Sequence, residues 1–269
     1  MLTELKDVQS QPDFRRIEID KVGIKDIRYP ITVLDRGQGT QQTVASINMY
    51  VDLPHHFKGT HMSRFVEILN EYRREINIKN IDRILREMRE RLSAKVAHIE
   101  IAFPYFIEKM APVTKTPGLM EYFCCIYGSS GEHWRDLVLE VHVPVTTVCP
   151  CSLEISCQGA HNQRGIVRVR IRFKRFFWIE DLVEIVEDCA SCEVYSVLKR
   201  PDEKFVTEKA FRRPMFVEDV VRAVCERLME HPEITWFSVE AENFESIHNH
   251  SAYAFIERRK TPPKSENGP

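Results

Sequence analysis

The chain has 269 residues, of which 43% are hydrophobic and 29% are charged, so it is a globular chain of one large domain or two domains of ordinary size. Its formal net charge is −2, which gives no support for a nucleic-acid-binding protein. Residues 1–16 lack the apolar core of a signal peptide, and no apolar run approaches the ~18 residues of a membrane span, so we expect a cytoplasmic protein that binds no membrane.

The first half of the chain predicts two strands, two helices and two further strands. Apolar side chains that alternate with polar ones indicate strands at 16–33, 43–53, 96–103 and 119–127. Apolar residues at helical spacing predict two amphipathic helices between the second and third strands, from Met62 to Tyr72 and from Ile81 to Leu92. The turn-forming residues 128–131 close this half.

The second half repeats this order of elements. Strands are expected at 137–145, 164–173, 235–241 and 251–256, and helices at 179–186 and 217–228. Two copies of an antiparallel sheet with helices on one face make an α+β architecture. We therefore expect a first module at 1–131, a second module at 132–259 that carries the cysteine-rich segment, and a disordered tail at 260–269.

The cysteine-rich segment VPVTTVCPCSLEISCQGAHNQRG, residues 143–165, is the chemical centre of the chain. It places the thiols of Cys149, Cys151 and Cys157 and the imidazole of His161 between two expected strands. Thiolate and imidazole suit a borderline metal such as Zn²⁺, and a thiol beside a metal can also act as a nucleophile or proton shuttle. Buried cysteines often only pack, but three thiols crowded among polar residues make that interpretation less favoured here.

Other possible metal ligands lie later in the chain. The polar clusters at 202–203 and 245–250 could add to the donors of the central segment. The CxxC pair Cys189 and Cys192 could join Cys149 and Cys151 in a four-thiolate zinc site, or form a redox pair. We favour two ordinary thiols, because this pair follows an expected helix, whereas a redox pair belongs at a helix start.

Three arginines alternate along one expected strand, which places them on the same sheet face. They are Arg168, Arg170 and Arg172. A solvated sheet face is the favoured interpretation, and the alternative is an electropositive surface that guides an anionic substrate.

Two features near helix starts could bind a nucleotide. Lys58, His61 and Arg64 could hold phosphates with the help of the helix dipole, although no Walker-type glycine loop is present. Glu218 lies in the first turn of another expected helix, where a carboxylate commonly stabilises the helix dipole. Its functional interpretation is an acceptor for the N–H and NH₂ edge of a guanine-like ring.

Seven segments, taken in order, resemble the bacterial type IB GTP cyclohydrolases. They are DVQSQPDFRRIEIDKVGIKDIRYP, NMYVDLPHHFKGTHMSRFVEIL, VTTVCPCSLEIS, GAHNQRG, LKRPDEKFVTE, FVEDVVR and NFESIHNHSAYA. The resemblance covers residues 7–254, and the ordered set is far more specific than any one segment. It implies the tunnelling fold (T-fold): two tandem β-β-α-α-β-β modules, antiparallel sheets with helices on one face, and a barrel completed by oligomerisation, as a homotetramer.

The resemblance also implies the roles of individual residues. The implied metal ligands, for Mn²⁺, Zn²⁺ or Fe²⁺, are Cys149, His161, Glu203 and His248, with Glu245 nearby. The implied catalytic residues are Cys149, Cys151, His161 and His248. The implied substrate-binding residues are Glu218 for the purine and Lys58, His61, Arg64 and Arg164 for the phosphates. Cys157 and Cys189 match no functional position.

The implied reaction converts GTP and water to 7,8-dihydroneopterin triphosphate and formate, the entry to folate. A divalent metal would activate the water that attacks C8 of the guanine ring, and His161, His248 or Cys151 would transfer protons. Three alternatives remain: an archaeal-type cyclohydrolase that forms a cyclic phosphate, a tunnelling-fold nitrile reductase that uses NADPH, and a non-catalytic module that binds a purine or zinc.

Overall fold

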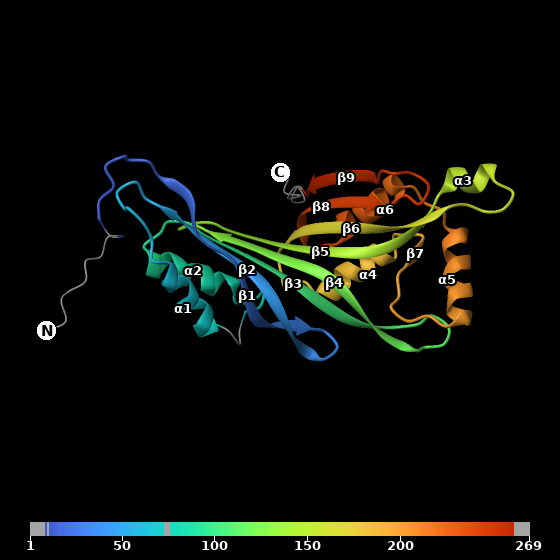
Figure 1. Cartoon of the computed structure of the whole chain (residues 1–269), viewed down its shortest axis with the longest axis horizontal. Coiled ribbons are helices and arrows are strands. Elements are labelled where there is room, and N and C mark those ends of the chain that lie inside the picture. Colours follow the sequence, from blue (N-terminus) through green and yellow to red (C-terminus); the bar gives the residue numbers. More distant parts are fainter. Residues whose placement is uncertain (1–8, 10, 73–75, 261–269) are drawn as a thin grey trace, which may run out of the picture. The chain divides into compact units, whose positions relative to one another are not determined.

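The computed structural model describes residues 9, 11–72 and 76–260. Its elements, labelled in Figure 1, are β1 (Ile19–Asp35), β2 (Gly39–Leu53), α1 (Met62–Tyr72), α2 (Ile81–Leu92), β3 (Ala97–Met110), β4 (Pro117–Ser130), β5 (Arg135–Val148), α3 (Pro150–Ile155), β6 (Asn162–Phe173), α4 (Ile179–Glu187), β7 (Cys192–Glu193), α5 (Arg200–Arg212), α6 (Val217–Glu230), β8 (Ile234–Asn243) and β9 (Ala252–Arg259). Within the described ranges, no helix is both long and apolar enough to cross a membrane.

The strands form a single sheet of nine strands. Their hydrogen-bonded order is β1-β2-β3-β4-β5-β6-β8-β9, and β7 pairs with β5. The pairs β1–β2, β2–β3, β5–β6, β6–β8 and β8–β9 are all antiparallel. In this path β1 and β9 are the two edge strands.

The predicted fold class is wrong in dividing the strands between two tandem β-β-α-α-β-β modules, each with its own antiparallel sheet. The strands belong to one sheet, and the second half has the order β5-α3-β6-α4-β7-α5-α6-β8-β9. The segment between the helices expected at 179–186 and 217–228, for which we expected no regular element, contains the 13-residue helix α5, whose buried residues are only Asp202 and Ala210. A helix with so small a buried face has no apolar stripe in its sequence, so the helical pattern failed to reveal it.

The chain divides into two compact units, which do not follow its two halves. The first comprises the described residues up to Pro104 together with Cys125–Val138, and the second comprises Tyr105–Cys124 and the described residues from Leu139. The modules expected at 1–131 and 132–259 stay a prediction. Of the tail expected to be disordered, 260–269, all but Lys260 lies outside the described residues.

In the first unit, α1 and α2 pack on the sheet as their apolar spacing predicts. Phe65 and Leu69 of α1 and Leu85 of α2 are fully buried. Strand β4 approaches α2 closely at Gly128, where an added Cβ would lie 2.6 Å from Cγ2 of Ile81. Only glycine permits this approach without a shift of the helix or the strand.

In the second unit, Asp202 at the start of α5 anchors the turn between β3 and β4. Its carboxylate accepts hydrogen bonds from the backbone N–H groups of Val113 (2.8 Å) and Thr114 (2.9 Å), from the Thr114 hydroxyl (2.7 Å) and from the backbone N–H of Lys199 (3.0 Å). Burial by itself would raise the pKa of Asp202, but these hydrogen bonds outweigh it and hold the pKa well below its usual range.

We expect Asp202→Asn to lower the Tm by several degrees at neutral pH, because a neutral amide is a weaker acceptor for these donors. The loss should shrink as the pH falls below about 4, since a carboxylate with a lowered pKa contributes its full stability above the pKa of the unfolded state and loses it as the pH falls through the lowered pKa of the folded state. Thermal unfolding followed by circular dichroism measures both effects. Glu208→Gln, an exposed change on the same helix, is the control. Equal Tm values for Asp202→Asn and wild type would contradict the anchoring role.

Candidate functional site

The cysteine-rich segment folds as the short helix α3 between two antiparallel strands. Strand β5 ends at Val148, and Cys149 is the N-cap of α3, with its Sγ accepting a hydrogen bond from the backbone N–H of Ser152 at 3.4 Å. Pro150 occupies the first turn, where its missing N–H costs nothing. The N–H of Cys149 donates to the carbonyl of His161 at 3.1 Å, which ties the start of α3 to the start of β6.

The three thiols of this segment differ in exposure. Cys149 is half-buried, whereas Cys151 in the first turn of α3 and Cys157 after it are exposed. The structure therefore separates a thiol fixed by the backbone from two thiols that reach solvent.

The imidazole of His161 is held by a chain of buried polar groups. Its Nδ1 lies 3.0 Å from Oε1 of Gln163, and Nε2 of Gln163 donates to Oγ1 of Thr147 at 3.0 Å. Thr147 and Gln163 face each other in the β5–β6 register and are both buried. Because a carbonyl oxygen can only accept, this contact requires a proton on Nδ1 of His161, and in the neutral ring the lone pair is then on Nε2.

Glu245 is the carboxylate beside this imidazole. Its Oε2 lies 3.7 Å from Nδ1 of His161, and both side chains are largely buried, at 12% and 13% exposure. Glu245 is the second residue of the β8–β9 connection, whose first residue, Phe244, donates its N–H to the carbonyl of Arg164 in β6 (2.9 Å). Strands β6 and β8 come close at Gly165, where a Cβ would lie 2.3 Å from Oδ1 of Asn243. The close approach of these two strands places the glutamate next to the histidine.

His248 lies farther along the same connection. Its ring stacks on that of His250, with centroids 5.0 Å apart and an interplanar angle of 13°, and both side chains are exposed. The structure therefore brings His161 together with Glu245 and with the backbone of Cys149. Across the described ranges, no three His, Cys, Asp or Glu side chains gather closely enough to hold a metal ion. The metal-ligand set stays a prediction.

Glu203 and Glu218 each lie next to an aspartate in the first turn of a helix: Glu203 follows Asp202 in α5, and Glu218 precedes Asp219 in α6. At α5 the neighbouring Asp202 accepts the backbone hydrogen bonds, and at α6 the neighbouring Asp219 accepts one from the N–H of Phe216 at 3.0 Å. Glu203 and Glu218 are exposed and make no side-chain hydrogen bond or ion pair with any residue that the structure describes. In each pair one acid serves the backbone and the other is available to a ligand.

The residues predicted to hold phosphates lie in both units, and their role stays a prediction. Lys58, His61 and Arg64 belong to the first unit, where Nη1 of Arg64 donates to the carbonyl of Arg91 at 2.9 Å. Arg164 belongs to the second unit and is exposed at the start of β6.

The row of arginines on β6 is engaged by side chains of its neighbouring strands. Arg168 pairs with Glu240, Arg170 pairs with Glu140, and the guanidinium of Arg172 lies 4.2 Å from the centre of the Trp236 ring. Charges that are neutralised in this way do not form a strong electropositive surface. The favoured interpretation, a solvated sheet face, agrees with these contacts.

The CxxC pair is buried in the second unit. Cys189 and Cys192 are 3% and 2% exposed, and Cys192 pairs with Thr146 of β5. Burial raises the pKa of both thiols, that of Cys192 to about 12. Thiols that stay protonated at neutral pH are poor nucleophiles and poor metal ligands, so these contacts agree with a packing role.

Gln163 and Thr147 are the site residues that sequence reasoning did not assign. A signal was present in the alternation of β6, where Gln163 shares the inward face with Gly165 and Val167. A glutamine on an inward face needs buried partners, and here those partners are a threonine and a histidine.

Comparisons with known proteins agree on one family. The family model described as type I GTP cyclohydrolase FolE2 matches residues 5–254. A GTP cyclohydrolase FolE2 of Syntrophus aciditrophicus is 62% identical over 252 residues, which cover 94% of this chain and 99% of that protein. A GTP cyclohydrolase FolE2 of Geobacter metallireducens is 60% identical over 259 residues, 96% of this chain and 99% of that protein.

Among solved structures, urate oxidases share the fold at low sequence identity. The urate oxidase of Bacillus sp. TB-90 matches with a TM-score of 0.54 and 7% identity, over 90% of this chain and 100% of that one. The uricase of Arthrobacter globiformis matches with a TM-score of 0.50 and 9% identity, over 93% and 96% of the two chains. At this identity the likeness concerns the fold alone.

We expect Gln163→Leu to lower the free energy of unfolding by about 1–3 kcal/mol, because it leaves a buried hydroxyl and a ring N–H without partners. It should also abolish the preference of His161 for the tautomer protonated at Nδ1. Urea unfolding measures the first effect, and ¹⁵N NMR of the histidine rings measures the second. Gln158→Leu, an exposed change in the same segment, is the control. An unchanged tautomer in Gln163→Leu would contradict the orienting role.

Proposed function

This chain belongs to the family of type I GTP cyclohydrolases FolE2, and from that premise we propose how its own residues carry out the reaction. It converts GTP to 7,8-dihydroneopterin triphosphate in folate biosynthesis, and formate is the second product. The observation that carries this conclusion is the match of the family model to residues 5–254, supported by identities near 60% over nearly the whole chain.

We assign the chain to the type IB enzymes and its reaction to hydrolysis of cyclic amidine C–N bonds. In this proposal a divalent metal, Mn²⁺, Zn²⁺ or Fe²⁺, binds Cys149, His161, Glu203 and His248, with Glu245 nearby. The donor chemistry fits, because these side chains supply a thiolate, imidazoles and carboxylates. The contacts of His161 support it, since its Nδ1 is occupied by Gln163 and its Nε2 lone pair is left for a metal. When bound, the metal supplies Lewis-acid activation of water.

The remaining residues of the site bind the substrate and move protons. Glu218, exposed and without a side-chain partner among the described residues, accepts the N–H and NH₂ edge of the guanine. Cys151, exposed in the first turn of α3, and His248, exposed in the β8–β9 connection, exchange protons with the opening ring. These two residues lie on different elements, and both can transfer protons because neither side chain is packed in the core.

The triphosphate is bound by basic residues in this proposal. These are Lys58, His61, Arg64 and Arg164. Fixing both ends of the substrate limits its motion while the sugar rearranges and the ring closes again.

We further propose that the protein works in the cytoplasm as a homotetramer. The edge strand β9 carries Tyr253 and Phe255, which are 58% and 50% exposed, and an edge with apolar side chains favours association. Light scattering tests this state, and a mass equal to the 31.6 kDa of one chain would contradict it.

The metal and the two thiols can be tested together in the purified protein. We expect chelation to abolish formate release from GTP and added Mn²⁺ or Zn²⁺ to restore it. Cys149→Ala should lose metal and activity together, whereas Cys151→Ala should keep its metal and lose about 10²–10⁴-fold in kcat, the usual contribution of a general acid or base. Cys157→Ala, with a thiol exposed like that of Cys151, is the matched control. A Cys151→Ala protein as fast as wild type would show that its thiol moves no proton.

For the purine, we expect Glu218→Gln to lower kcat/KM for GTP by about 10–100-fold, because hydrogen bonds to a charged group contribute about 1.5–3 kcal/mol. The preference for GTP over ITP, which lacks the 2-amino group, should fall as well. Glu226→Gln, an exposed change on the same helix, should leave both values unchanged. Wild-type discrimination in Glu218→Gln would rule out this carboxylate as the purine anchor.

A further inference from the structure

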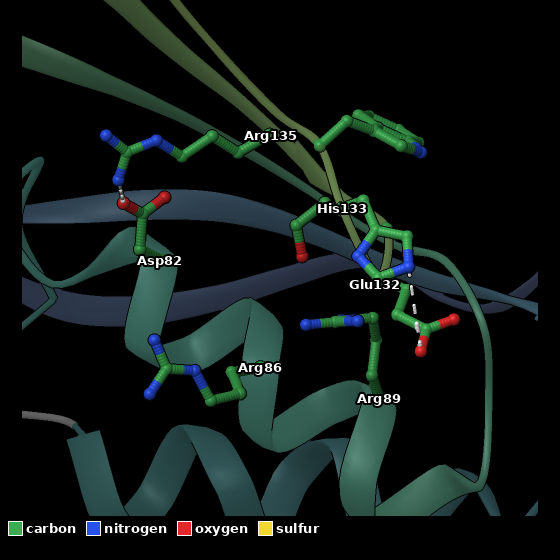
Figure 2. A pocket seen from close by; sticks show the side chains of 9 residues that line it. Asp82, Arg86, Arg89, Glu132, His133 and Arg135 are labelled. Carbon is green, nitrogen blue, oxygen red and sulfur yellow. Dashed lines mark hydrogen bonds and ion pairs between the residues drawn. The ribbon is translucent and has the colours of Figure 1, made fainter.

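The first unit contains a separate pocket. No residue that we assigned to catalysis or to binding of the metal or the substrate lines it. Its volume is about 350 Å³, and it lies between α2 and the turn that joins β4 to β5 (Figure 2). Helix α2 contributes Asp82, Arg86 and Arg89, and the turn contributes residues 130–135. We call it the arginine pocket, after Arg86, Arg89 and Arg135.

Two polar groups in the arginine pocket are buried without hydrogen-bond partners among the residues that the structure describes. Ser130 is only 7% exposed, and its Oγ bonds to none of these residues. Nε of Arg89 is likewise buried and makes no hydrogen bond to any of them. Buried polar groups are nearly always satisfied in native proteins, so a buried hydroxyl and a buried guanidinium N–H that line one cavity indicate a missing acceptor. The acceptor would have to reach both from inside the pocket.

The balance of charge in the arginine pocket indicates the sign of that ligand. Nη1 of Arg135 pairs with Oδ2 of Asp82 at 2.7 Å, which neutralises both (Figure 2). Arg86 and Arg89 make no ion pair or side-chain hydrogen bond with any described residue. Two positive charges are therefore left uncompensated by these side chains, and they lie three residues apart on one face of α2.

The other charged groups of the pocket do not cancel this excess. Nε2 of His133 lies 3.9 Å from Oε1 of Glu132, and their side chains are 87% and 83% exposed. Glu132 and His133 therefore belong to the solvated rim, where charges are screened. The pocket therefore keeps the positive charges of Arg86, which is exposed, and Arg89, which is half-buried.

The turn that carries Ser130 is fixed before any ligand binds. The N–H of Gly131 donates to the carbonyl of Trp134 at 2.9 Å, and the indole covers Gly131 so closely that a Cβ there would lie 2.3 Å from its Nε1. Gly128, two residues before Ser130, lets β4 lie against α2. Ser130 is therefore held facing the helix. A preorganised donor loses little freedom when it binds a ligand.

We propose that the arginine pocket binds the phosphate group of a small molecule. A phosphate monoester carries about −1.5 to −2 charges at neutral pH and three acceptor oxygens. It therefore matches two uncompensated guanidinium groups and a serine hydroxyl, and the planar fork of arginine suits two of its oxygens at once. A single carboxylate has one charge and two oxygens, which leaves part of this donor set unused.

The test uses the full-length chain and inorganic phosphate as the probe. Thermal unfolding is measured at increasing phosphate concentration and constant ionic strength, because a ligand of the folded state raises the Tm as it saturates. Trp134, half-exposed beside the pocket, adds a fluorescence signal. We expect wild type to show saturable binding, and malonate, a carboxylate dianion, to bind more weakly than phosphate.

Variants of the pocket then locate the binding. Arg89→Gln and Arg86→Gln should each weaken phosphate binding about tenfold or more, since each loses charge-assisted hydrogen bonds, and Ser130→Ala should weaken it less. Arg83→Gln removes an arginine from the same helix but outside the pocket, so it should match wild type. Without phosphate, Arg89→Gln should unfold no earlier than wild type, because Arg89 has no partner to lose among the described residues.

Several results would overturn the proposal. They are the absence of saturable binding to wild type, equal effects of Arg83→Gln and Arg86→Gln, malonate binding as tight as phosphate, and loss of phosphate binding in Arg164→Gln but not in Arg89→Gln. The last result would assign the phosphate to the GTP site instead. Because Arg86 is exposed, Arg86→Gln decides the question independently of the half-buried Arg89.

Discussion

The candidate site depends on the hydrogen-bond chain from Thr147 through Gln163 to His161. It exists because the β5–β6 register places a threonine opposite a glutamine on the buried face, where neither can turn to water for a partner. The glutamine has one donor end and one acceptor end, so once the donor end is used on Thr147, the acceptor end faces the imidazole. A slip of one residue in this register would turn Gln163 to the other face and leave the histidine unoriented.

At the starts of α5 and α6, two adjacent acidic residues have two different roles. One accepts hydrogen bonds from the backbone, and the other is left for a ligand. The backbone N–H groups at a helix start need acceptors, and Asp202 and Asp219 provide them. The neighbouring Glu203 and Glu218 have a longer side chain and are turned outward, so they are left to meet a ligand. The structural and the functional carboxylate differ by one position, which explains why residue type alone cannot assign their roles.

Much of the fold follows from periodicity. The helices at Met62 and Ile81 and the strands on either side of the cysteine-rich segment appear where apolar spacing predicts them. Helix α5 and the single sheet are features that apolar periodicity did not predict. Helix α5 buries little apolar surface, so it has no stripe to detect. The joining of all strands into one sheet depends on hydrogen bonds between strands, and these involve backbone groups that every residue shares.

For the site, the sequence by itself determined which chemistry is present. Thiols, imidazoles and carboxylates in an ordered set of segments were enough to identify the family, because that order is specific to it. Only the tertiary structure decided which atoms meet: that Gln163 and Glu245 both approach Nδ1 of His161, that Asp202 accepts hydrogen bonds from the backbone, and that Arg86 and Arg89 share a pocket with Ser130. The physical reason is that burial and hydrogen bonding depend on neighbours distant in the chain, and sheet register and helix packing choose those neighbours.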